Sequence, residues 1–315
     1  MDIRHKITGE ILHSVPGETL EAADLNGVDL AGADLAGANL VGANLAGANL
    51  SRATLEEADL AGANLAGAKI IQANLAGANL RRATLEGANL TRANLDGADF
   101  ARADLREVTL AGVDLREVNL EGANLKETTL EGANLAGVNL GGADLTRANL
   151  GGANFGGADL SLATLVGTNL KRADFERANL DGANLTRANL GGADLTRANL
   201  AGANLGGATL KEAILVGATL REATLVGANL TWANLIRANL EGANLEEAKI
   251  EGASLAGANL KGANLSRATL EAANLKWANL EGATLVGTNL RGANLEEAKI
   301  DPPVPDEDET PGPGY

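Results

Sequence analysis

The sequence predicts an all-β fold in which the chain winds as one continuous coil into a single rod. A five-residue word, Ala-Asp/Asn-Leu-x-x, runs from Ala23 to Ile300 without insertion or deletion. Every fifth position from Leu20 to Ile300 is Leu, Phe or Ile, and aromatic residues make up only 2% of the 315 residues, too few for an ordinary globular core. Because repeat arrays grow along one axis, we expect one rod rather than the two domains that the length alone suggests.

The period of five excludes both an α-helix and a flat strand. On a helix, steps of five residues rotate by about 140°, which scatters the leucines around the axis. On a flat strand, successive leucines point to opposite faces. Within one word, however, the small residue and the Leu face the same way if that piece is extended, and the two variable residues can turn the chain. Many of the 40 glycines occupy the second variable position, where a turn can require a positive φ.

The same word, as in the segment 143–150 (ADLTRANL), resembles that of the pentapeptide repeat family over about 280 of the 315 residues. The resemblance implies a right-handed quadrilateral parallel β-helix, a pentapeptide-repeat solenoid with four words per coil. The Leu and the small residue before it then point inward, and the other three positions point outward. Residues 21–300 would form about 14 coils, a rod of roughly 65–70 Å at the spacing of paired strands.

Residues 1–20 differ from the array and are predicted to form a β-hairpin cap over its open end. Pairing Ile7 with Ile11 gives a hairpin with a three-residue loop, and in that register Ile3 faces Val15.

The last segment, 301–315, is rich in proline and acidic residues and is expected to be disordered. In some members of the family a C-terminal helix or a bare last coil mediates dimerisation. Because no helical segment is visible here, we expect a monomer or a weak dimer.

Two departures from the inward pattern predict local packing differences. Phe155 and Phe175 are twenty residues apart, so they would stack in neighbouring coils. Val108, Val113 and Val118 replace Ala on three successive sides, so that coil is expected to be slightly swollen or offset.

Few residues carry chemistry. The chain has no cysteine, which excludes disulfides, thiolate zinc sites and a cysteine nucleophile. The only histidines, His5 and His13, would face each other in the hairpin and could bind a metal with Glu10 or Asp2, but imidazoles packed on the first coil are the stronger interpretation. The paired glutamates at the corners face solvent. We therefore predict no enzymatic activity, no cofactor and no metal.

Charge and hydropathy restrict the partners. The net charge of −15 argues against direct nucleic-acid binding, which needs a basic surface. No stretch is long and apolar enough to span a membrane, and no apolar run follows the first residues, so a cytoplasmic protein is expected.

The resemblance raises one specific function, the protection of DNA gyrase by an acidic rod that imitates duplex DNA. The most acidic side, which contains Leu35 and Leu55, carries 11 acidic and 5 basic residues. Duplex DNA of the same length carries roughly 40 charges, and Arg177, Arg197 and Arg237 interrupt the acidic side. DNA mimicry is therefore the alternative hypothesis.

The leading hypothesis is a rod-like scaffold that presents a surface to an unknown protein partner. Most outward positions are polar or small, but Ile214, Trp232, Ile236 and Trp277 are large and apolar. The first three fall on two adjoining sides of neighbouring coils, and Trp277 lies two coils further along. Exposed aromatic residues with aliphatic neighbours often mark a contact surface, whereas scattered apolar residues such as Leu162 are normal.

Overall fold

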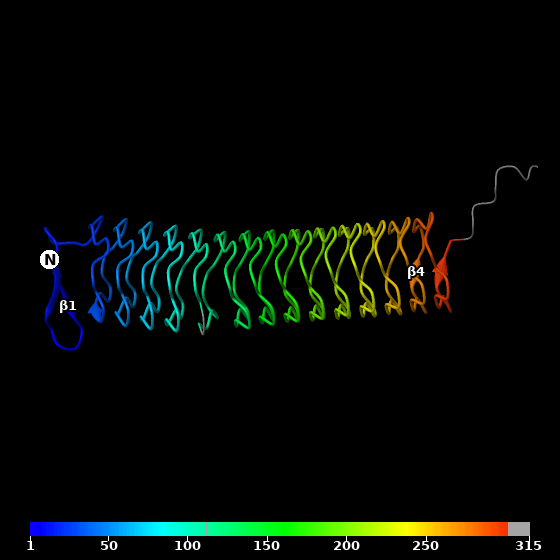
Figure 1. The fold of residues 1–315 in the computed structure, drawn as a ribbon. Helices are drawn as coiled ribbons and strands as arrows, with labels where there is room; N and C mark the ends of the chain where they lie inside the picture. The colour runs from blue at the N-terminus through cyan, green and yellow to red at the C-terminus, as the bar shows by residue number, and fades with distance from the viewer. Residues whose placement is uncertain (111–112, 302–315) are drawn as a thin grey trace, which may run out of the picture.

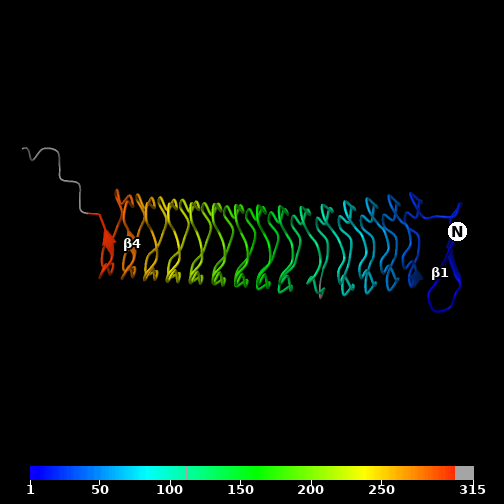
Figure 2. The same ribbon diagram turned by 180° about the vertical axis from the view of Figure 1, so that it is seen from behind.

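The computed structural model describes residues 1–110 and 113–301. The chain forms a long rod in which coils stack along one axis (Figure 1). Five short strands are β1 (Asp2–His5), β2 (Ile11–Ser14), β3 (Ala33–Asp34), β4 (Asn279–Leu280) and β5 (Lys299–Ile300). Between them the coils are joined by single parallel β-bridges. Seen from behind, β1 again lies at one end of the rod and β4 at the other (Figure 2).

Each coil takes twenty residues, because every bridge pairs a residue with the one twenty positions later. Asp24 pairs with Asn44, and Asn44 pairs with Asn64. The Leu25 N–H donates to the Asn44 carbonyl at 2.7 Å, and the Asn44 N–H donates back to Ala23 at 2.9 Å. Four such words complete one coil, so the backbone groups of each word are satisfied by the coils on either side.

The two variable residues of each word make a tight corner. The Ala148 N–H donates to the Leu145 carbonyl at 3.0 Å, and the residue between them at the second variable position, Arg147, has a φ of 59°. A positive φ recurs at this position in every described word, as a type II turn requires. The expected role of glycine there is confirmed, but 25 residues with side chains also adopt this conformation.

The interior is a continuous column of Leu and Ala, most of them 0–1% exposed. Burying one Leu contributes about 1.5–3 kcal/mol, so the column stabilises the rod coil by coil. Phe155 and Phe175 stack within it, with ring centroids 4.7 Å apart and planes 1° from parallel. Their predicted stacking is confirmed.

Asp and Asn side chains form ladders on the outside. The Asp24 carboxylate accepts a hydrogen bond from the Asn26 N–H at 3.3 Å and another from the Asn44 side-chain amide at 3.0 Å. The first bond holds the corner and the second joins adjacent coils, which explains why the word prefers Asp or Asn at this position.

The first residues form an antiparallel hairpin, β1 with β2, and β1 also pairs with β3 of the first coil. The expected register of this hairpin is wrong. Ile3 faces His13 instead of Val15, a bulge follows Ile3, and the His5 N–H donates to the Glu10 carbonyl. The cause is burial: Ile3 is 1% exposed against the end of the core, whereas Ile7 is 82% exposed and does not direct the pairing.

The coil that contains the three valines is irregular. Val108, Val113 and Val118 are all buried, so their extra methyl groups take up space in the interior that alanine leaves free in other coils. Within the described parts of the chain, no bond joins the Leu95 N–H to the Asp114 carbonyl, although the equivalent bond of Leu75 is 2.8 Å long. This coil therefore pairs incompletely with its neighbours.

At the far end, β4 pairs with β5 in parallel, and the Asp301 carboxylate accepts a hydrogen bond from the Gly282 N–H at 2.6 Å. The prediction of disorder concerns residues that, apart from Asp301, lie outside the described part of the chain. Among the residues that are described, no helix is long and apolar enough to cross a bilayer.

Candidate interaction surface

The candidate surface lies on the side of the rod that carries Leu215, Leu235 and Leu255, called here the Leu235 side. Ile214 pairs with Asp194 and Asn234 in successive coils, so it occupies a position where this side otherwise holds Asn, Asp, Thr or Ser. Its side chain is 39% exposed. An aliphatic residue there forfeits the hydrogen bonds of the ladder and presents apolar surface to solvent.

Trp232 occupies the corner that leads into the Leu235 side. It has a φ of 61°, a left-handed conformation that is unfavourable for a bulky residue, and it is 62% exposed. Its ring leans onto Gly252 of the next coil, where an added Cβ would lie 2.4 Å from the ring atom Cζ3. Because Gly252 has no side chain, the indole ring packs directly on its backbone. A glycine twenty residues after the tryptophan is the sequence feature that could have predicted this contact.

Ile236 lies at the opposite corner of the same side and is half-buried. The equivalent residue in the coil before is Val216, since the Gly217 N–H donates to the Ile236 carbonyl, and in the coil after it is Ala256. Both are also half-buried. Sequence reasoning missed Val216, because a single valine at a variable position is not unusual. The structure thus brings Ile214, Trp232 and Ile236 onto adjoining coils around one side.

Trp277 is held apart from this group. It is 56% exposed at a φ of 60°, but its indole N–H donates to Glu297 at 2.9 Å. The Lys276 ammonium group lies 4.3 Å from the ring centroid and also pairs with Glu296 at 2.8 Å. Trp277 is therefore bonded to the last coil. The corner that contains Ala256 separates it from Ile236.

The two histidines do not form the expected facing pair. His13 lies opposite Ile3, whereas His5 lies opposite Ala33 of the first coil. The Nδ1 atom of His5 accepts hydrogen bonds from the N–H groups of Ile7 and Thr8, both at 3.2 Å. Over residues 1–110 and 113–301, no three His, Asp or Glu side chains come close enough together to hold a metal ion.

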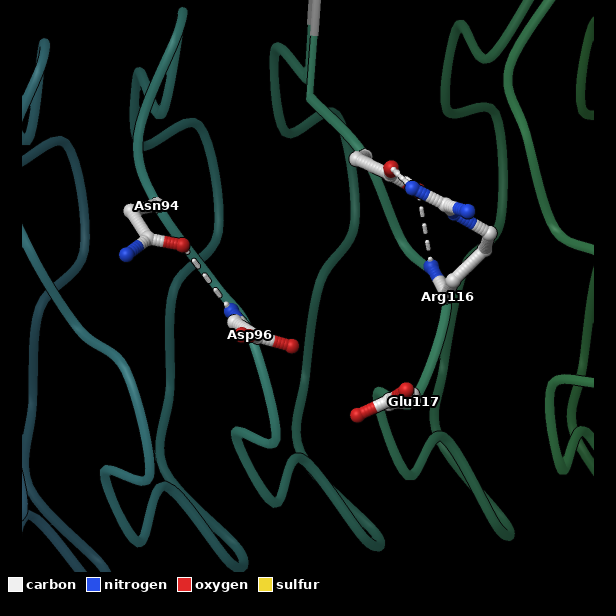
Figure 3. A pocket seen from close by; sticks show the side chains of 5 residues that line it. Asn94, Asp96, Arg116 and Glu117 are labelled. Carbon is white, nitrogen blue, oxygen red and sulfur yellow. Dashed lines mark hydrogen bonds and ion pairs between the residues drawn. The ribbon is translucent and has the colours of Figure 1, made fainter.

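A hollow of about 370 Å³ lies beside the coil with three valines and is lined by Asn94, Asp96, Asp114, Arg116 and Glu117. Figure 3 shows the side chains that line it. The Arg116 guanidinium binds both carboxylate oxygens of Asp114, with contacts of 2.6–3.1 Å, and this hydrogen bonding lowers the pKa of Asp114. A lowered carboxyl pKa is the opposite of what a general acid needs near neutral pH. The hollow is an ion-paired surface depression.

Charge is distributed unevenly along the rod. Residues 141–240 carry nine Lys and Arg against eight Asp and Glu. The rest of the chain carries 17 Lys and Arg against 33 Asp and Glu. The apolar group on the Leu235 side therefore lies in a nearly neutral section of an acidic rod. Arg197 and Arg237 flank it at the corner shared with Ile236.

The repeated bridges and the outward-facing surface define a solenoid repeat protein of the β-helical class. The chain belongs to the pentapeptide repeat family: the family model for pentapeptide repeats matches in overlapping segments from residue 19 to residue 301. The right-handed quadrilateral parallel β-helix expected from the sequence is confirmed.

Three solved structures illustrate the likeness. HetL from the cyanobacterium Nostoc sp. strain PCC 7120, a pentapeptide repeat protein involved in heterocyst differentiation regulation, is 35% identical over 77% of this chain and 89% of its own, with a TM-score of 0.29. QnrB1, a plasmid-mediated fluoroquinolone resistance protein, is 18% identical over 76% and 89%, with a TM-score of 0.32. A pentapeptide repeat protein of the Arabidopsis thaliana thylakoid lumen is 32% identical over 36% and 65%, with a TM-score of 0.16. No curated protein matches this chain significantly.

Proposed function

We propose that the protein is a rigid, non-enzymatic scaffold that binds another protein through the surface formed by Ile214, Trp232 and Ile236. The observation that carries the proposal is the exposed indole of Trp232, held in a left-handed backbone conformation over Gly252. Neither the core nor the coil pairing uses this ring. A large aromatic side chain kept in place outside the core is typical of an interface anchor.

A partner that covers Trp232 would also reach the neighbouring aliphatic side chains on the Leu235 side. Together they offer an apolar centre with polar and charged residues around it, which is the usual composition of an interface. Trp277 contributes to the same interface only if the partner extends two coils further. Its bonds to the last coil already fix its ring, so its loss should weaken binding less than the loss of Trp232.

The test compares Trp232→Ala and Trp277→Ala with Leu162→Ala in affinity purification from the native host. Leu162 is a matched control, since it is 71% exposed, has a φ of 56° and also leans onto a glycine of the next coil, Gly182. We expect Trp232→Ala to lose the partner that Leu162→Ala retains, with unchanged thermal unfolding of both proteins. Retention of every partner by the double tryptophan variant would refute the proposal.

The second candidate is the acidic DNA mimic that binds DNA gyrase. It is favoured by the rigid rod and by the excess of 11 acidic over 5 basic residues on the side of Leu35 and Leu55. That side is the Leu235 side, and three of its bases, Arg177, Arg197 and Arg237, stack along one corner in the same section as Ile236. Absence of any effect on gyrase supercoiling at micromolar protein would eliminate this candidate.

A further inference from the structure

A cationic notch lies on the corner that carries Trp232. Three successive coils place Lys171 and Arg172, then a glycine doublet, then Lys211 and Glu212 at this corner. The Arg172 N–H donates to the Gly191 carbonyl at 3.0 Å, and the Gly192 N–H donates to the Lys211 carbonyl at 2.9 Å, so these corners are directly stacked.

The doublet leaves a hollow because it adds no side chains between two charged corners. Its volume is about 330 Å³, and its remaining lining includes Asn189 and Thr209. Asn189 accepts the Gly191 N–H through its side-chain oxygen at 3.1 Å, so its amide group remains as a donor. A Cβ on Gly191 would lie 3.3 Å from that oxygen, and any larger side chain would fill the notch.

The positive groups around the notch are available to a ligand. Among the described residues, no carboxylate lies within 4.0 Å of the cationic groups of Lys171 or Arg172. In the described part of the chain, Lys211 forms an ion pair only with Glu212, at 3.5 Å, and both side chains are more than half exposed. An exposed pair of this kind is weak, so an incoming anion can compete for the ammonium group.

An apolar anchor lies on the same corner, two coils beyond the glycine doublet and one coil beyond Lys211. The Glu212 N–H donates to the Thr231 carbonyl at 3.0 Å, which places Trp232 directly after the Lys211 corner. Because the ring leans one coil further, onto Gly252, it lies two to three coils from the doublet, about 10–14 Å, which an extended peptide spans with about three to four residues. Carboxylates in the notch and an apolar side chain on Trp232 can therefore belong to one short segment.

We propose that this corner binds an extended acidic segment of the partner protein, with its carboxylates between Lys171, Arg172 and Lys211 and an apolar side chain on Trp232. The inference rests on the proposed function and names the chemistry of the partner. The nearly neutral section of the rod repels such a segment less than the coils before residue 141, which hold most of the acidic excess of the array.

The test uses the full chain with Trp277→Phe, which leaves Trp232 as the only tryptophan. A short synthetic peptide with paired glutamates and a leucine three residues away is titrated while Trp232 fluorescence is followed. We expect a shift of the emission that saturates, weakens with added salt, and is about 10–100-fold weaker in affinity for Lys171→Glu with Lys211→Glu. Lys261→Glu, a single charge reversal on another corner, should leave the affinity unchanged, whereas Lys171→Glu alone should already weaken binding.

Three outcomes of the peptide titration would overturn the inference. The first is no binding by the parent protein, and the second is equal affinity for the peptide with glutamine in place of glutamate. The third is displacement by inorganic phosphate with no involvement of Trp232, which would indicate a simple anion site. A further result would be a native partner that stays bound to Lys171→Glu with Lys211→Glu and yet is lost by Trp232→Ala. That result would refute the acidic segment but support the proposed protein-binding surface around Trp232.

Discussion

The ring of Trp232 lies against Gly252 of the following coil so closely that a Cβ on Gly252 would come within 2.4 Å of the ring. The bare backbone of one coil thus sets the direction of an exposed side chain in the coil before it. The same relation joins Leu162 to Gly182, where the added Cβ would lie 2.9 Å away.

Gly252→Ala should move the Trp232 ring without unfolding the rod. The new methyl group cannot coexist with the ring, whereas Gly227→Ala meets no atom within 4 Å. Both glycines have a positive φ, so both variants lose a similar stability, about 1–2 kcal/mol. We expect only Gly252→Ala to change Trp232 fluorescence and weaken partner binding. Identical spectra for the two variants would contradict this arrangement.

Replacing Arg106 should alter how stability depends on pH. The side-chain hydrogen bonds from Arg106, at 2.7–3.0 Å, are the main reason why the pKa of Asp104 is lowered. A lowered folded-state pKa stabilises the protein above the ordinary value of about 3.9, and this contribution disappears as the pH falls through the folded-state pKa.

Arg106→Gln should therefore be less stable than the parent at neutral pH and equally stable in strong acid, as measured by urea unfolding across that range. Arg116→Gln is a second case, because Asp114 depends on its arginine in the same way. A stability difference that persists unchanged below pH about 2 would show that the pKa shift is not its origin.

The stacked rings of Phe155 and Phe175 should be energetically coupled. Each Phe→Leu change keeps an aliphatic group in the column, but either one removes the stacked pair. A double-mutant cycle in thermal unfolding should give a coupling of about 0.5–1.5 kcal/mol, the range for aromatic pairs. The pair Phe155→Leu and Phe100→Leu is the control, and strictly additive effects for both pairs would rule out a specific contribution from stacking.

The coil with three valines should open more readily than the rest. The N–H groups of Leu95 and Gly97 lack the bonds to the next coil that Leu75 and Gly77 make at 2.8 Å, in the described parts of both coils. Unpaired amides exchange with solvent faster, and incomplete pairing lowers the free energy of local opening. Hydrogen exchange by mass spectrometry should show faster uptake in peptides covering 93–118 than in peptides covering 193–218. Equal protection would contradict the incomplete pairing.

The candidate surface could be predicted only in part from the sequence. A strict period identifies which residues face outward, so Ile214, Trp232 and Ile236 could be found as large apolar residues at outward positions. Their neighbours were harder to find, because the side chain of a corner residue can lean toward the coil before or after it. That direction decides three features of the surface. They are the packing of Trp232 on Gly252, the contacts of Trp277 with Glu297 and Lys276, and the cationic notch.

The sequence by itself determined the rod and its Leu and Ala interior, because every word repeats the same local turn and contacts only the coils beside it. The twenty-residue coil followed from the resemblance to the pentapeptide repeat family and not from the period of five. The tertiary structure decided the register of the hairpin, the incomplete pairing at Val113 and the direction of each exposed ring. These depend on how a residue packs against another coil, where burial of Ile3 or the space above Gly252 outweighs any preference within one word.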